Sequence, residues 1–326
     1  MQARTAVIPA AFAIALGFLS PSLAQDGSYP SRPVRLLVSS APGGNPDILG
    51  RLLAERMSQD FGQAVVLENV QGAGTAMVAL TEAKATPDGY TLMFGDSGNM
   101  AIIPALNPNI GYDPVKDFTP ITALAAVPTI LVANPQLKAP TLSDFLALAR
   151  QEPGKITYGS GGVGSIHHLT MALFADQTGI DVLHVPYRAG TAMVNGLLTG
   201  EIQVAWSGIP NVLSGIGSGQ LRSYCISILQ RSPSAPAVPT CDELGIKGFD
   251  VATVIGLYAP AGAPPQVVTR LAAEAAKVMR EPAMAERMNQ LGMIMREDGT
   301  ANYIEYRKQD AERYANIVRR LNLHVN

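Results

Sequence analysis

The chain has 326 residues, a formal net charge of −2 at pH 7, and 47% hydrophobic and 15% charged residues. This composition is that of a soluble globular protein, and the length is sufficient for two domains. Because no stretch is rich in Lys or Arg, nucleic acid is excluded as an expected partner, since neutralising phosphates requires a basic face.

The first predicted element is a secretory signal peptide at residues 1–24. One early positive charge, Arg4, precedes an apolar stretch, and helix-breaking Pro21 and the tripeptide Ser-Leu-Ala follow it. This order is typical of a signal with a small-x-small cleavage site, and the apolar part is too short to span a membrane. We therefore expect cleavage and a mature chain that begins at Gln25, free in a bacterial periplasm. A buried first helix is the alternative.

Apolar runs, Gly-rich loops and amphipathic helices then alternate along the chain. Strands are predicted at residues 34–40, 65–69 and 90–95. Helices with apolar residues three and four apart are predicted at residues 48–62 and 78–85, and a short one follows the loop at 96–99. Near-continuous apolar strands that alternate with helices indicate a mostly parallel sheet covered on both faces.

A long apolar run at residues 121–136, broken by Pro128, leads into a second unit of the same kind. A helix opened by Thr141 or Ser143 follows it, and another helix is predicted at 167–179. Further strands are predicted at residues 155–160, 182–187, 201–208 and 221–228, with a helix that ends near Gly200 between the second and third of these.

The end of the chain contains one more long strand, at residues 251–262, followed by helices at 264–282, 283–292 and 301–323. This order predicts an α/β protein of two lobes joined by two crossing strands. Lobe 1 is expected to comprise residues 25–125 and 250–326, and lobe 2 residues 126–249. Open α/β sheets bind ligands at the carboxyl ends of their strands, so we expect a binding cleft between the lobes.

The two cysteines, Cys225 and Cys241, are separated by one predicted loop. In an oxidising compartment such a pair can form a disulfide, which would stabilise the fold by about 3 kcal/mol. The sequence leaves open whether the two residues come within reach. The four histidines are not spaced as a ligand set with either cysteine, so no metal and no cofactor is expected.

The segment KITYGSGGVGSIHH, residues 155–168, is compatible with three kinds of site. Its glycines fit the G-x-G-x-x-G of a dinucleotide-binding turn, but the acid expected about 20 residues later is absent, and only Arg188 lies there. A hydrolase would use Ser160 or Ser165 with a histidine. However, His167 and His168 are consecutive helix residues that do not face one another, and there is no G-x-S-x-G elbow.

The third kind of site, an anion cradle, is the one we favour for this segment. Hydroxyls of Ser160 and Ser165 and amides of Gly161 and Gly164 would form it.

The loop APGGNPD, residues 41–47, is a second candidate cradle. Gly43 and Gly44 allow backbone amides to turn toward a ligand at the N-terminus of the following helix, where an anion is favoured. Asn45 is expected to cap that helix and Pro46 suits its first turn. The alternative is a tight strand–helix turn in which Asp47 only stabilises the helix dipole.

Further candidates are the loops at residues 72–75, 95–99, 187–191 and 206–208, which follow predicted strands. Thr191 opens a helix, so N-capping explains it as well as ligand binding does. Trp206, the only tryptophan, either lines the cleft or fills the core of its lobe.

Several motifs occur together along the mature chain. They are YPSRPVRLLVSSAPGGNPDILGRLLAERM, VVLENVQGAGTAMVA, TPDGYTLMFGDSGN, YDPVKDFTPIT, PGKITYGSGGVGSIHHLTMALF, VLHVPYRAGTAMVNGLLTGEIQ, LRSYCIS followed by RSPSAPAVPT, and LYAPAGAPPQVV. In this order they resemble the periplasmic substrate-binding proteins of tripartite tricarboxylate transporters, often called the Bug family. The chain departs from the usual family pattern at Ser40, where an aromatic residue is common, at Asn45-Pro46, and at Cys241.

The resemblance implies the type II periplasmic-binding-protein fold, a Venus flytrap with two crossing hinge strands. It also implies a monomer that captures a small mono- or dicarboxylate, aliphatic or aromatic, and delivers it to membrane transporter subunits without acting as an enzyme. The alternatives are a secreted hydrolase and a binding module that feeds a sensor. The predicted ligand-binding residues are Ser40, Ala41, Gly43, Gly44, Asp47, Ser97, Ser160, Gly161, Gly164, Ser165, His168, Tyr187, Thr191 and Ser207.

Overall fold

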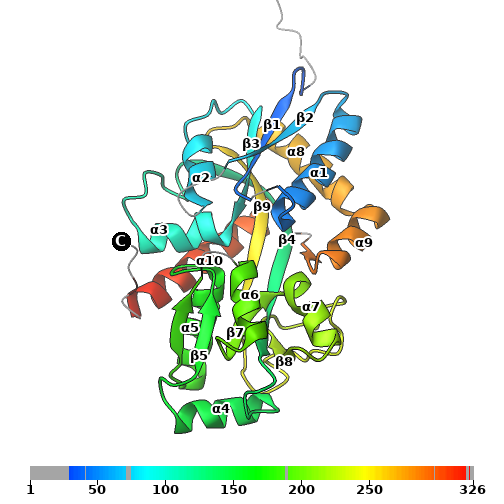
Figure 1. The fold of residues 1–326 in the computed structure, drawn as a ribbon. Helices are drawn as coiled ribbons and strands as arrows, with labels where there is room; N and C mark the ends of the chain where they lie inside the picture. Colours follow the sequence, from blue (N-terminus) through cyan, green and yellow to red (C-terminus); the bar gives the residue numbers. More distant parts are fainter. Residues whose placement is uncertain are drawn as a thin grey trace, which may run out of the picture.

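The computed structural model describes residues 29–40, 42–70, 75–187, 190–296, 298–320 and 323. The predicted signal peptide and Ala41 lie outside the described residues. The chain forms two α/β lobes, one above the other in Figure 1, so the predicted fold class is confirmed. Ten strands hydrogen-bond into one curled sheet that runs through both lobes.

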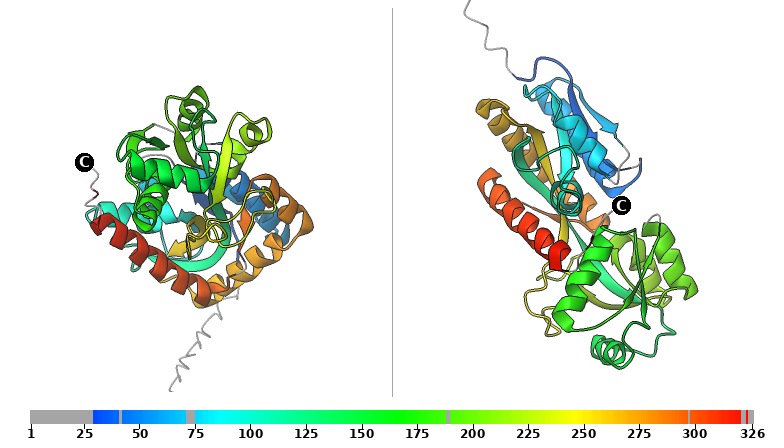
Figure 2. Two further views of the ribbon diagram at one scale, coloured as in Figure 1. Left: turned by 90° about the horizontal axis from the view of Figure 1, so that it is seen from below. Right: turned by 90° about the vertical axis from the view of Figure 1, so that its left-hand side faces the viewer.

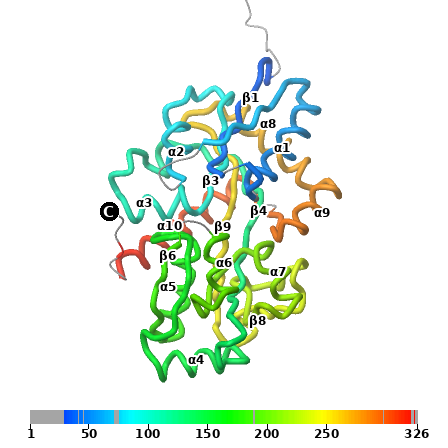
Figure 3. The backbone as a smooth tube through the Cα atoms, viewed as in Figure 1, coloured from blue at the N-terminus to red at the C-terminus, as the bar shows by residue number. Residues whose placement is uncertain are grey.

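Three parallel strands begin the sheet of the first lobe. They are β1 (Val34–Val38), β2 (Val65–Asn69) and β3 (Thr91–Asp96), in the order β2-β1-β3. Next to β3 lies β9 (Ala252–Pro260), antiparallel to it, and then β4 (Phe118–Ala133), antiparallel to β9. Figure 3 follows β4 and β9 as they pass from one lobe to the other.

The long strand β4 changes its partners along its length. Its residues 118–128 pair with β9, and its residues 129–133 pair with β7 (Val204–Gly208). The predicted break at Pro128 is therefore wrong, because the strand passes through it. Pro128 occupies the last register position with β9, so its missing N–H falls where the ladder changes partners and is tolerated.

The sheet of the second lobe is mixed. β5 (Thr157–Ser160) lies parallel to β6 (Leu183–Pro186) and to β7, whereas β8 (Arg222–Ile226) pairs antiparallel with β4. The predicted strands of this lobe are thus present, although two of its pairings, β4 with β7 and β4 with β8, are antiparallel.

The helices cover the faces of both halves of the sheet. They are α1 (Asn45–Phe61), α2 (Ala76–Glu82), the π-helix η2 (Gly98–Ile102), α3 (Ile103–Leu106), α4 (Leu142–Gln151), α5 (Ile166–Thr178), α6 (Gly190–Thr199), α7 (Ile209–Gly217), α8 (Pro265–Met279), α9 (Pro282–Gln290) and α10 (Thr300–Arg320). The sequence did not predict α7 or the short strand β10 (Ile294–Met295). Helix α7 is short and contains Pro210, which its first turn tolerates because the amide there needs no partner.

A capping box decides where α4 begins. The Thr141 hydroxyl accepts the Asp144 N–H at 3.2 Å, and the Asp144 carboxylate accepts the Thr141 N–H at 3.0 Å. Thr141 is therefore the N-cap, and Ser143 lies inside the helix.

The last helix, α10, reaches from the first lobe to the second (Figure 2). Near its start, the Thr300 hydroxyl donates to the Ile121 carbonyl of β4. Near its end, Tyr314 and Ile317 pack in one apolar cluster with Leu169 of α5. Arg320 also forms a 2.7 Å ion pair with Asp176 of α5. The helix therefore holds the two lobes together on one side.

Trp206 lies in the core of the second lobe, which settles the alternative left open by the sequence. Its side chain is fully buried, and its ring centroid lies 5.5 Å from those of Phe174 and Phe249. Cys225 and Cys241 belong to the same apolar cluster and form a disulfide, with Cα atoms 5.0 Å apart. That Cα separation is within the usual range for a bridge.

The disulfide is expected to stabilise the unreduced chain by about 3 kcal/mol, because it closes a loop with a sequence separation of 16 residues. Urea unfolding with and without reductant measures the difference. Thiol counting of the denatured, unreduced protein provides the direct check: no free thiol is expected, and two free thiols would contradict the bridge.

Glu82 of α2 is a fully buried acid in the first lobe. Neither of its carboxylate oxygens has a hydrogen-bond partner among the described residues, and burial raises its pKa to about 8. The folded protein therefore prefers the protonated acid. The free energy of unfolding should fall as pH rises from about 4.5 to 8, because ionising this group costs more in the folded state.

The variant Glu82→Gln is expected to match the wild type at pH 4 and to exceed its stability at pH 9 by on the order of 3 kcal/mol. Denaturant unfolding across this pH range measures the effect. Glu55→Gln, at an exposed position of α1, serves as control and should follow the wild-type profile. An equal pH dependence in Glu82→Gln and wild type would refute the assignment.

Candidate functional site

The strand directions turn the loops of the two lobes toward one another. Strands β1, β2 and β3 run parallel to β4 because β3 is antiparallel to β9, and β9 to β4. Strands β5, β6 and β7 run the opposite way, because β7 is antiparallel to β4. The carboxyl ends of β1–β3 therefore point at the second lobe and those of β5–β7 at the first, as the ribbon shows (Figure 1).

The loop after β1 is organised by the carboxylate of Asp47. One oxygen accepts the Gly43 N–H at 2.9 Å, and the carboxylate receives two hydrogen bonds from the Arg51 guanidinium, also at 2.9 Å. The Asn69 amide donates to the same carboxylate at 2.8 Å and to the Ser40 carbonyl at 2.9 Å. The side chain of Asp47 is 2% exposed, and both of its oxygens already accept hydrogen bonds from protein groups. Asp47 therefore fixes the shape of the loop and does not face a ligand.

Helix α1 begins at Asn45, three residues before the predicted range of 48–62 and one residue before the start that an Asn45 cap implies. Gly44 is its N-cap, in extended conformation, and no described side chain forms a capping hydrogen bond, so the prediction that Asn45 is the cap is wrong. Asp47 takes over part of that role by bonding back to Gly43, which has φ +84°. Within the described residues, the amides of Gly44, Asn45 and Asp47 have no acceptor, as is usual in a first helical turn.

Hydrogen bonds within the loop also shape the second cradle, which follows β5. The Ser160 hydroxyl oxygen accepts the Gly162 N–H at 3.0 Å and lies 2.6 Å from Nε2 of His184. The Gly164 N–H donates to Nδ1 of His168 at 3.1 Å.

The hydroxyl of Ser165 accepts the His168 N–H at 3.3 Å, so Ser165 is the N-cap of α5. Within the described part of the chain, the amides of Gly161, Val163, Ile166 and His167 have no acceptor. These four amides are thus free to bind a ligand. The Gly164 amide, which was also predicted to contribute, is instead bonded to His168.

Among the buried polar atoms that have no partner within the described residues, four lie in the segments that form or follow the carboxyl ends of strands, two in each lobe. They are Oγ of Ser40, Oγ1 of Thr75, Nδ1 of His167 and Oγ of Ser207. Leaving such an atom unpaired costs about 1–3 kcal/mol, so these four atoms call for a partner such as a ligand or an ordered water. Thr75 also has φ +91°, which is costly for a β-branched residue.

His167 lies inside the second cradle. A methyl group on Gly161 would be 3.3 Å from its Nδ1, and one on Gly190 would be 3.5 Å from its Cε1, so the ring lies against both glycines. Burial lowers the pKa of His167 to about 4, which keeps the ring neutral at pH 7.

Three predicted residues lie elsewhere. His168 is stacked behind the loop, with its ring against His184. Tyr187 turns inward, and a methyl on Gly196 would be 2.3 Å from its hydroxyl. Thr191 lies on the exposed side of α6.

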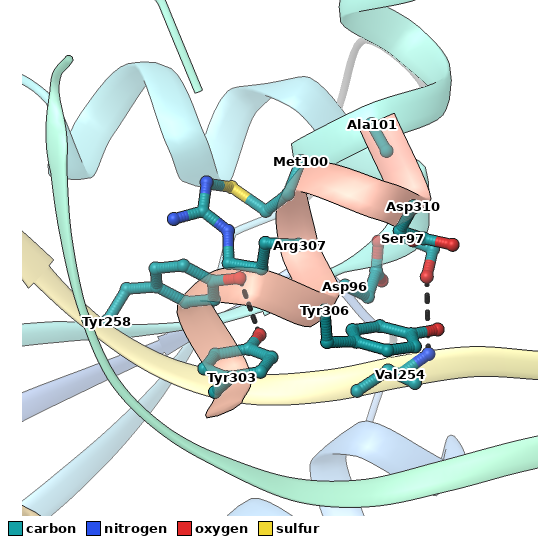
Figure 4. A pocket seen from close by; sticks show the side chains of 10 residues that line it. All are labelled: Asp96, Ser97, Met100, Ala101, Val254, Tyr258, Tyr303, Tyr306, Arg307 and Asp310. Atoms are coloured by element: carbon teal, nitrogen blue, oxygen red, sulfur yellow. Dashed lines mark hydrogen bonds between the residues drawn. The ribbon is translucent and has the colours of Figure 1, made fainter. Parts of the chain in front are cut away.

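Ser97 belongs to a separate buried cluster between η2, β9 and α10 (Figure 4). Its hydroxyl accepts the Val254 N–H at 3.2 Å and lies near Asp310, whose pKa is raised to about 6 by burial. Close by, the hydroxyls of Tyr258 and Tyr303 share a hydrogen bond. The cavity there has a volume of about 10 Å³, enough for about one water molecule and too small for an organic acid.

Sequence reasoning missed His184 and did not place Thr75 and His167 in the predicted set. The available signals were the position of Thr75 at a helix start, after the loop that follows β2, and the imidazole of His167 at the end of the Gly-rich segment. No signal pointed to His184, because it contacts Ser160 only through the pairing of β5 with β6.

In the described ranges, no group of three or more His, Cys, Asp or Glu side chains is arranged to hold a metal ion. No helix in that part of the chain is long and apolar enough to cross a membrane.

Comparison with known sequences identifies a matching protein family and a similar protein. The sequence model of the family described as tripartite tricarboxylate transporter family receptor matches residues 49–323. Protein BugT of Bordetella pertussis is 33% identical over 296 residues, which cover 90% of this chain and 90% of BugT.

Three solved structures share the fold and more than a quarter of the aligned residues. The structure of periplasmic binding protein BugD has a TM-score of 0.76 and 31% identity, covering 91% of this chain and 99% of BugD. An R. palustris protein with adipate has a TM-score of 0.80 and 28% identity, with coverages of 91% and 99%. MatC from Rhodopseudomonas palustris, with bound malate, has a TM-score of 0.76 and 29% identity, with coverages of 89% and 100%.

The bonds of Asp47 lead to a prediction for acid stability. The pKa of Asp47 is lowered to about 2. The largest cause is the hydrogen bonding of the Arg51 guanidinium, and the Gly43 and Asn69 donors add to it. The stabilisation is thus present above the unfolded-state pKa and is lost as pH falls from about 4 to 2. Because Arg51 is 56% exposed, solvent screens the pair, and we expect Asp47→Asn to cost about 1–2 kcal/mol at pH 7.

Urea unfolding at pH 7 and at pH 2 measures this loss. The control is Asp88→Asn, which removes an exposed ion pair with Arg32 and should cost less than about 1 kcal/mol. Equal losses in the two variants would show that Asp47 has no special role in the loop.

Proposed function

Because the chain belongs to the tripartite tricarboxylate transporter receptor family, which confirms the resemblance to the Bug family, we propose that it is an extracytoplasmic solute-binding protein for a small organic carboxylate. The observation that carries this proposal is the set of polar atoms and amides without a partner among the described residues, in the loops and helix starts that follow strands of both lobes. The set offers hydrogen-bond donors to an anion in the absence of a metal ion.

The two cradles suit a ligand with a carboxylate at one end and a second polar group at the other. In the first lobe the amides of Gly44 and Asn45 and the hydroxyls of Ser40 and Thr75 would bind it. Hydrogen bonds to a charged group contribute about 1.5–3 kcal/mol each. Three or four of them, less the ordering cost, are of the size needed for micromolar affinity, which corresponds to about 8 kcal/mol.

In the second lobe, we assign ligand contacts to the open amides of Gly161 and Val163, to Nδ1 of His167 and to the Ser207 hydroxyl. A neutral imidazole and a serine hydroxyl can each donate or accept, so they suit a hydroxyl or a second carboxyl group of the ligand. The adipate and malate of the neighbouring structures have this character.

Binding is proposed to favour the closed arrangement of the lobes, since a ligand that contacts both lobes binds most tightly when both surround it. In this proposal lobe 1 comprises residues 25–125 and 250–326, and lobe 2 residues 126–249. The closed monomer would then dock on the membrane subunits of a tripartite transporter. Residues 1–24 would direct the chain to the periplasm and be removed there.

A hydrolase is the second candidate, since Ser160 lies 2.6 Å from Nε2 of His184. Three observations count against it. Ser160 is fully buried, its oxygen already accepts the Gly162 N–H, and no carboxylate among the described residues hydrogen-bonds to His184. A nucleophile needs exposure and a base that is held in place by a third group.

Thermal unfolding with adipate, malate and a panel of other mono- and dicarboxylates tests the proposal. A ligand at about 100 times its dissociation constant should stabilise the protein by about 2.7 kcal/mol. No shift with any acid, together with turnover of an ester that Ser160→Ala abolishes, would favour the hydrolase.

The variant Ser207→Ala makes the test specific. Removing a buried hydroxyl that has no partner should leave the ligand-free protein as stable or more stable, whereas affinity for the acid should fall about tenfold. The control is Ser143→Ala, at an exposed position of α4, which should change neither quantity. An unchanged affinity in Ser207→Ala would remove that residue from the site.

A further inference from the structure

Two histidine rings stack behind the loop at residues 161–165. The ring centroids of His168 and His184 are 4.4 Å apart with an interplanar angle of 15°, and the ring of Tyr158 lies 4.8 Å from that of His184. His168 projects from the first turn of α5 and is 6% exposed, and His184 belongs to β6. The three rings therefore form one stacked unit that joins β5, β6 and α5.

Each histidine controls one amide of the loop. Nδ1 of His168 accepts the Gly164 N–H at 3.1 Å. Nε2 of His184 lies 2.6 Å from the Ser160 hydroxyl, whose oxygen accepts the Gly162 N–H at 3.0 Å. Alternate amides of the loop are thus bonded inward, and both glycines have the positive φ values, +110° for Gly162 and +78° for Gly164, that this conformation requires.

The alternation determines which amides remain for a ligand. With the second and fourth amides of the loop bonded inward, those of Gly161 and Val163 have no acceptor among the described residues. The Ser165 N–H closes the loop by donating to the Gly162 carbonyl at 3.1 Å. If either inward bond were lost, the glycine backbone would be free to turn its amide, because glycine adopts several conformations at little cost.

We propose that His168 and His184 are positioning residues: the stacked pair holds two amides of the 161–165 loop inward, so that the neighbouring amides are presented to the ligand. Neither imidazole touches the ligand in this arrangement. The part of the inference that concerns ligand affinity rests on the proposed function, whereas the part that concerns loop geometry does not.

The two histidines differ in their response to protonation. Nδ1 of His168 accepts a hydrogen bond only when unprotonated, so its neutral ring carries the proton on Nε2. Protonating Nδ1 would set two N–H donors against each other and release Gly164. His184 can hold Ser160 in either form, because the hydroxyl can donate to Nε2 or accept from it while Gly162 stays bonded.

The charged and titratable groups near His168 come from several elements. His184 of β6 and Tyr158 of β5 stack with it, and Asp176 and Asp181 line the same groove of about 280 Å³. The α10 residue Arg320 neutralises Asp176. Burial, first, and the neighbouring His184 lower the pKa of His168 to about 4, so the inward bond is intact at pH 7 and is lost as pH falls through about 4.

Amide hydrogen exchange in the ligand-free protein tests the loop geometry. In His168→Leu the Gly164 amide should exchange roughly three- to tenfold faster than in wild type, because its acceptor is gone. In His168→Asn the amide oxygen can replace Nδ1, so exchange should return toward the wild-type rate. His184→Leu and His184→Gln form the equivalent pair for Gly162.

The control is Tyr158→Phe, which keeps the ring on His184 and removes only a hydroxyl, so both amides should exchange as in wild type. Equal Gly164 exchange in His168→Leu and His168→Asn would overturn the proposal. So would a wild-type 15N spectrum in which Nδ1 of His168 carries the proton at pH 7, a measurement that does not depend on the folding of any variant.

Calorimetric titration with adipate and with malate tests the consequence for binding. His168→Leu is expected to bind the acid roughly three- to tenfold more weakly than His168→Asn and wild type. Below pH 5 the wild type should lose affinity faster than His168→Asn, because only the wild type has a His168 that becomes protonated. The ionisation of the ligand affects both proteins equally. Equal affinities in all three proteins would overturn the positioning role while leaving the proposed function intact. If neither these acids nor any other acid of the panel binds to wild type but the exchange pattern holds, the proposed function fails and the loop assignment stands.

Discussion

The antiparallel pairing of β4 with β9 is the constraint on which both lobes depend. One strand, Phe118–Ala133, hydrogen-bonds to β9 over its first part and to β7 over its last residues. Its direction therefore fixes the directions of the strands on both sides. Strand β3 runs in the same direction as β4, and β7 runs in the opposite direction. The loops of the two lobes therefore approach one another from opposite ends of the same sheet. No separate interface is needed to turn the carboxyl ends of the strands of each lobe toward the other lobe.

Each cradle is shaped by internal acceptors, and its remaining donors are left open. In the first lobe, Asp47 binds the amide of Gly43 and is held by Arg51 and Asn69. In the second, a serine and a histidine take the inward amides. A charged guanidinium is thus used to fix the shape of the first loop, and the side that we propose for the ligand presents neutral amides, hydroxyls and an imidazole. Such a site favours an anion without neutralising it by an opposite charge.

The sequence predicted the fold well because periodicity and turn residues are local signals. The strands and most helices, the crossing strand at residues 251–262 and the two Gly-rich loops are where the pattern indicated. The partners of individual side chains were harder to predict. Asp47 was predicted to contact ligand, but its acceptors are consumed by groups from β2 and α1. Ser97 follows a strand end, yet it faces α10, which is some two hundred residues later in the chain. His184 gained its role only through strand pairing. Such contacts depend on long-range register, which a single sequence does not display.

The position of α10 limits how the lobes can separate. Its last turns pack on η2 and α3 of the first lobe and on α5 of the second, and Arg320 ties it to Asp176. Breaking this seam would expose apolar side chains to water and cost free energy, whereas bending β4 and β9 alone would not. The least costly motion is therefore a hinge rotation that separates the lobes on the side away from α10 and keeps the contacts of that helix with both lobes. A solute would then enter on the side of the molecule opposite that helix.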